Sequence, residues 1–174
     1  MMLRALLLLA ITAVAGRGLA QQNPCEGFSW NVSHERALFA ATATSSAAGA
    51  SMQTAPLLAP EMLHDLQLGL QSHVAFAAPP GKSRPGDGPY AGLARLQVTA
   101  SGTYRISLDQ AAWIDVIDTD RPIASGDFQG RPGCVAPHKI VQFALPAGKE
   151  LLIQLSGAQD MHLKLTVTHV DGTP

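Results

Sequence analysis

From Leu63 onward, apolar residues recur at every second position, and clusters of Gly, Pro, Asp and Ser separate the runs. This alternation predicts successive strands that each bury one face. The clearest runs place their apolar side chains at Tyr104, Ile106 and Leu108, at Val141, Phe143 and Leu145, and at Leu163, Leu165 and Val167. Weaker runs cover residues 63–68, 73–77, 93–98, 113–117 and 150–156. About eight such strands predict an all-β fold, an antiparallel β-sandwich of jelly-roll-like type.

The chain before these strands has a different pattern. Residues 33–39 begin with Ser33 and continue with good helix formers, so we expect one short N-terminal helix capped by this serine. Residues 40–60 are rich in Ala, Ser, Thr and Gly and predict a long connection. A second long connection, residues 79–89, is rich in proline and glycine.

The N-terminus has the three parts of a secretory signal peptide. Met1 to Arg4 form a positive start, residues 5–15 are apolar, and Gly18 to Ala20 form a small-residue cleavage site. The apolar run is shorter than the roughly 20 residues that a membrane-spanning helix needs. We therefore predict a signal peptide over residues 1–20, a single β-sandwich domain over 21–174 without a transmembrane segment, and a periplasmic or secreted location.

Charge argues against nucleic acid as a partner. The whole chain has a formal net charge of −1, and removal of residues 1–20 takes away two basic residues, Arg4 and Arg17, and no acidic one, which leaves −3. A binding protein for nucleic acid needs a basic patch, and the sequence shows none.

The two cysteines, Cys25 and Cys134, both lie after the expected cleavage site. They allow a single intramolecular pairing, and an oxidising compartment favours that disulfide over two free thiols. A metal pair would need further ligands at short spacing, such as C-x-x-C, which the sequence lacks. The predicted bridge would tie the start of the domain to its middle.

The same bridge defines a candidate metal site. His34 and Glu35 follow Cys25 closely, and His138 follows Cys134 by four residues. Two histidines and a carboxylate are the ligands of non-haem iron and of some zinc sites, so a transition metal is the alternative to a protein without cofactor. The competing interpretation has His34 and Glu35 solvated on the helix and His138 bonded to a backbone carbonyl at the start of a strand.

A candidate ligand site lies around Trp113. Trp113 alternates out of phase with Ile114 and Val116 and falls on the side of Asp115, where an indole beside a carboxylate could hold a sugar. Burial of this tryptophan in the core is the competing interpretation. The other candidate ligand-binding residues are Lys82 and Arg84 in the second connection, and Tyr90 just after it.

Several motifs resemble known families. The chain is similar to a family of small exported bacterial proteins without an assigned activity in CEGFSW (25–30), SHERALF (33–39), GTYR (102–105), WIDV (113–116), Cys134 and PHKIV (137–141). Some members of that family carry the name homogentisate 1,2-dioxygenase, which belongs to a larger iron-dependent enzyme. ASGTYR (100–105) and PAGKE (146–150) resemble a turn of bacterial pre-peptidase C-terminal domains, which implies a sandwich architecture.

These observations predict an exported binding or envelope-associated accessory module without catalysis of its own. Its expected partner is a protein or a carbohydrate. The alternative is a metal-dependent enzyme of dioxygenase type that uses His34, Glu35 and His138.

Overall fold

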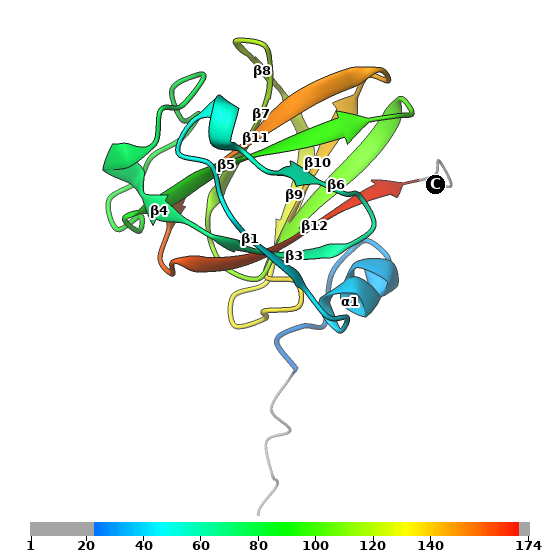
Figure 1. The fold of residues 1–174 in the computed structure, drawn as a ribbon. Helices are drawn as coiled ribbons and strands as arrows, with labels where there is room; N and C mark the ends of the chain where they lie inside the picture. Colours follow the sequence, from blue (N-terminus) through cyan, green and yellow to red (C-terminus); the bar gives the residue numbers. More distant parts are fainter. Residues whose placement is uncertain (1–22, 171–174) are drawn as a thin grey trace, which may run out of the picture.

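A computed structural model describes residues 23–170, so the predicted signal peptide lies outside the described residues. Two six-stranded sheets pack face to face as a β-sandwich (Figure 1). The first sheet has the order β1 (Thr44–Ala47), β3 (Leu63–Gln67), β12 (His162–Val170), β6 (Gly102–Leu108), β10 (Lys139–Leu145) and β9 (Ser125–Gly130). The second has the order β2 (Leu57–Leu58), β5 (Tyr90–Val98), β11 (Lys149–Ala158), β7 (Trp113–Asp118) and β8 (Arg121–Ile123), and β4 (Gly69–Leu70) pairs with β5. The predicted sandwich class is confirmed.

The pairing directions refine this prediction. Most neighbouring strands are antiparallel, but β1 pairs with β3, and β2 with β5, in parallel. Both strands lie within residues 40–60, which the sequence predicted as a connection. Strand β9 was not predicted either, because its sequence SGDFQG has no alternating apolar face and is mostly exposed at the sheet edge.

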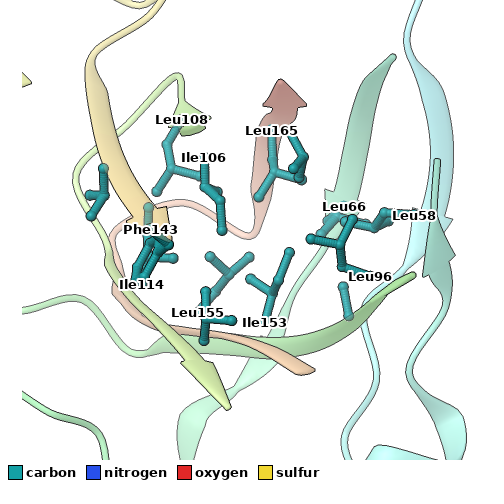
Figure 2. Packing of buried hydrophobic residues seen from close by; sticks show 14 of the residues in the cluster. Leu58, Leu66, Leu96, Ile106, Leu108, Ile114, Phe143, Ile153, Leu155 and Leu165 are labelled. Carbon is teal, nitrogen blue, oxygen red and sulfur yellow. The ribbon is translucent and has the colours of Figure 1, made fainter. Parts of the chain in front are cut away.

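The core lies between the two sheets, where the alternating side chains interlock (Figure 2). In the first sheet Phe143 lies opposite Tyr104, and Ile106 lies between Val141 and Val167. These residues are buried, as the alternation predicted. Figure 2 shows Ile106 and Phe143 facing residues of the second sheet, among them Leu96, Ile114, Ile153 and Leu155.

Helix α1 (Ser33–Phe39) lies on the outer side of the first sheet, next to β12 (Figure 1). Its bounds match the prediction, but Ser33 is the first helical residue rather than the cap. The side chain of Asn31, two residues earlier, reaches forward to the helix start, where its Oδ1 accepts a hydrogen bond from the Ser33 N–H at 3.0 Å. Among the described residues, no helix has both the length and the apolar character needed to cross a membrane.

The helix is held to the sheet by a buried ion pair. Arg105 of β6 donates to Glu35 Oε1 at 3.1 Å, and Thr168 of β12 bonds the same oxygen at 3.3 Å. The Glu35 side chain is only 3% exposed and that of Arg105 12%. Glu35 is therefore a structural residue of the helix–sheet contact and is not solvated.

The predicted disulfide is present between Cys25 and Cys134, whose Cα atoms lie 4.8 Å apart. It joins the segment before the helix to the loop between β9 and β10. Ser29 N–H also donates to the Gln129 side chain at 2.7 Å, so the N-terminal segment is fastened to this region at two points. The bridge agrees with folding in an oxidising, extracytoplasmic compartment.

The predicted strand over residues 73–77 is wrong. These residues belong to a covering loop, residues 71–89, which begins with the 3₁₀ turn Gln71–His73 and crosses the outer face of the second sheet. Val74 and Phe76 pack on the buried residues Leu93, Ile117 and Leu152 of that face, which explains their apolar alternation. The backbone groups of Ala77 and Ala78 bond a buried side chain of the sheet instead of a neighbouring strand.

Candidate functional site

A cavity of about 580 Å³ opens beside Trp113, and we call it the Trp113 pocket. Three separate parts of the chain form most of its wall: residues 81–87 of the covering loop, residues 111–115 leading into β7, and residues 128–139 around the disulfide loop. Its inner end reaches Ile114 and Val141, which are core residues of the two sheets. The pocket therefore exists only when both sheets and both loops are in place.

A buried glutamine holds the covering loop on the sheet. Gln154 of β11 is fully buried, and its Oε1 accepts hydrogen bonds from the N–H groups of Ala77 at 2.7 Å and Ala78 at 3.3 Å. Its Nε2 donates to the Ala78 carbonyl at 3.1 Å. One side chain thus provides the bonds that a neighbouring strand would otherwise make.

Further along the loop, Asp115 fixes Gly81. Asp115 Oδ2 accepts from the Gly81 N–H at 3.1 Å. A Cβ atom at residue 81 would lie 2.7 Å from Asp115 Oδ1, so a side chain there would collide with the carboxylate. This contact holds the loop backbone one residue before Lys82 and occupies one oxygen of Asp115.

The Trp113 ring is the centre of a cluster of cations. Arg84 Cζ and Lys139 Nζ lie 4.8 Å and 4.7 Å from the ring centroid, and Lys82 Nζ lies at 5.6 Å. All three are within the range of cation–π attraction. The indole Nε1–H donates to Asp87 Oδ2 at 2.9 Å, and the same oxygen accepts from the Arg84 N–H at 2.6 Å.

Among these cations, Lys139 is partly buried and has a lowered pKa. Its Nζ donates to the Ala112 carbonyl at 2.7 Å. Burial first, and then the neighbouring charges of Lys82 and Arg84, lower the pKa of Lys139 to about 8, while Asp115 and Asp87 act in the opposite direction. The direction of the shift means that burial and repulsion together outweigh the attraction of the two carboxylates.

The pocket has an excess of positive charge. Lys82, Arg84, Arg131 and Lys139 line it, against the two carboxylates Asp87 and Asp115. This is a local excess in a chain whose formal net charge is −1. Because four basic side chains outnumber two carboxylates here, the pocket is suited to an incoming negative group.

An exposed aromatic residue stands at the pocket wall. Phe128 of the edge strand β9 is 66% exposed, more than any other large apolar side chain that the structure describes. An exposed aromatic face beside a polar cavity is typical of binding sites for amphipathic small molecules.

Four of the five predicted ligand-site residues meet in this pocket: Lys82, Arg84, Trp113 and Asp115. Tyr90 does not line it, because it begins β5, pairs with Leu70 and packs against the core. Trp113 is half-buried, and three cations lie close to its ring, where the sequence predicted that a sugar could stack.

The sequence did not indicate Asp87, Phe128 or Lys139 as part of this site. Asp87 shares the covering loop with the predicted Lys82 and Arg84, and this proximity was the one available signal. Lys139 and Phe128 belong to the other sheet, and their approach to Trp113 depends on how the sheets are stacked.

The structure does not bring the three candidate metal ligands together. His34 Nε2 lies 2.5 Å from Glu61 Oε2, Glu35 faces Arg105 and Thr168 as described, and His138 Nδ1 contacts the Cys134 carbonyl at 3.1 Å. Within residues 23–170, no group of three or more His, Cys, Asp or Glu side chains is arranged to hold a metal ion. The carbonyl contact of His138 agrees with the competing interpretation.

No protein-family model, no curated protein and no solved structure matches the chain. The residues of the Trp113 pocket are therefore the basis for the functional proposal.

Proposed function

We propose that this protein is a periplasmic or secreted binding or envelope-associated accessory module, without catalysis of its own, that holds its ligand in the Trp113 pocket. The observation that carries the proposal is the convergence of Trp113 and three cations on one open cavity. The cavity volume falls in the range of small-molecule sites, about 300–1,000 Å³.

The fold supports this role in two further ways. A disulfide-closed sandwich suits a protein that works outside the cytoplasm, where thiols are oxidised. The pocket is built from loops on a rigid pair of sheets, which is where binding residues commonly lie. Its expected ligand is a carbohydrate or a group on a partner protein.

The two tryptophans of the chain give a direct test. Trp113 lines the pocket, whereas Trp30 lies outside it and stacks with Arg105. In protein labelled with 5-fluorotryptophan, a ligand of the pocket should shift the ¹⁹F resonance of Trp113 saturably and leave that of Trp30 in place. A panel of neutral and acidic oligosaccharides and envelope peptides, tested at millimolar concentration, would provide the ligands.

A panel in which no compound shifts the Trp113 resonance would contradict the proposal. A compound that shifts only Trp30 would place the binding site elsewhere and would contradict it as well.

A further inference from the structure

The charges of the Trp113 pocket identify a ligand class, on the condition that the proposed function holds. Lys82 and Arg84 approach the indole ring from the covering loop, and Lys139 approaches it from the start of β10. Three cations in such a small space repel one another, and the protein's own carboxylates leave an excess of positive charge. An anion placed among these cations would relieve the repulsion, which gives it a binding energy that a neutral molecule lacks.

The size of the pocket argues for an organic anion. A cavity of about 580 Å³ is much larger than a single carboxylate or phosphate group requires. Its wall also includes Phe128, whose exposed ring offers an apolar surface for the body of a ligand. An inorganic ion would contact the cations but would not cover this apolar surface.

We infer that the Trp113 pocket binds an acidic saccharide, with a sugar carboxylate among Lys82, Arg84 and Lys139 and the sugar body against Phe128. Recognition then has two separable parts, a charged one at the tryptophan and an apolar one at the rim. The depressed pKa of Lys139 supports this arrangement, since a bound carboxylate would stabilise the protonated amine.

Trigalacturonate and the neutral trisaccharide of galactose are the matched probes, because they differ mainly in their carboxylates. Binding is followed by the Trp113 ¹⁹F shift and by isothermal titration calorimetry. Trigalacturonate should bind at least tenfold more tightly than the neutral probe, and its affinity should fall with added salt. Equal affinities would overturn this inference while leaving the proposed function intact, and no shift with any ligand of the wider panel would overturn both.

The charged part is tested with Lys82→Gln and Arg84→Gln, both on the exposed loop, so that the fold is preserved. Each should weaken trigalacturonate binding by about tenfold, since a hydrogen bond to a charged group contributes at least that much. Arg121→Gln removes the same charge from a side chain that is 91% exposed and outside the pocket, and it should leave the affinity unchanged. Equal losses in all three variants would mean that net charge alone attracts the ligand and would refute the site.

The apolar part is tested with Phe128→Ala and with inorganic phosphate as a second probe. The variant should weaken trigalacturonate several-fold and leave phosphate binding unchanged. Phosphate binding as tight as that of trigalacturonate, with no effect of Phe128→Ala on either, would overturn the saccharide assignment.

Discussion

Phe143 provides the most direct test of how the two sheets pack. Its side chain is 1% exposed, lies opposite Tyr104 in the first sheet and faces the second sheet (Figure 2). Truncation to alanine removes the apolar contacts of the ring and leaves a cavity that the rigid sheets cannot close. Phe143→Ala should therefore lower the free energy of unfolding by about 3–5 kcal/mol.

Such a loss is a large part of the stability of an ordinary domain, about 5–15 kcal/mol. At about 2–4 °C per kcal/mol for a chain of this size, the midpoint of thermal unfolding should fall by about 6–20 °C. Equilibrium urea denaturation, followed by circular dichroism, measures the free energy directly. Phe143→Leu keeps much of the burial and serves as a milder variant if the alanine protein does not fold.

Phe128→Ala is the matched control, because it deletes the same ring from a side chain that is 66% exposed. It should change the stability by no more than about 0.5 kcal/mol. If the two alanine variants unfold at the same urea concentration, Phe143 does not lie in the core, and the face of β10 that carries it does not point toward the second sheet.

Three further predictions concern the disulfide, the buried ion pair and the pocket lysine. Mass spectrometry without reductant should find the chain two hydrogens lighter than its reduced form, and replacing Cys25 and Cys134 by serine should cost about 4–5 kcal/mol in urea denaturation, because the bridge closes a loop with a sequence separation of 109 residues. Glu35→Leu should cost about 3–5 kcal/mol because it leaves the Arg105 charge buried and unpaired, whereas adding Arg105→Met should recover most of that loss. Fully additive losses in this double-mutant cycle would show that the pair is not coupled. The pKa of Lys139 is lowered from 10.5 to about 8 in the folded protein, so between pH 8 and 10.5 the unfolded chain binds more protons and the free energy of unfolding should rise with pH. Urea denaturation of the Lys139→Met variant should lack this part of the rise, and identical pH profiles of variant and wild type would contradict the shift.

The strands that could be predicted from sequence are those with one apolar face and one polar face. Alternation along the sequences of β6, β10 and β12 correctly predicted that Ile106, Phe143 and Leu165 lie in the core. Strand β1, with the sequence TSSA, and strand β9, with the sequence SGDFQG, have no such contrast, because they lie at the edges of the first sheet and are largely exposed. Their pairing partners, rather than their own side chains, determine that they are strands.

The candidate site was predictable in part for a related reason. Lys82 and Arg84 stood out as cations in a connection rich in proline and glycine, and Trp113 by its phase relative to Ile114. Nothing local in the sequence connects these residues with Lys139, which approaches the indole from the other sheet. The metal prediction rested on the disulfide bringing His34 and His138 into one region, and chain proximity did not determine where their side chains point.

The position of Gln154 under the first half of the covering loop separates two properties of the protein. The bonds from Gln154 to Ala77 and Ala78 keep the sheet covered whatever follows along the chain. Residues 82–87, which carry the pocket cations Lys82 and Arg84, lie beyond these bonds and are exposed. Substitutions and changes of length within 82–87 therefore alter what the pocket recognises without removing support from the core. The sandwich is thus a scaffold on which specificity can diverge by exchange of one short loop.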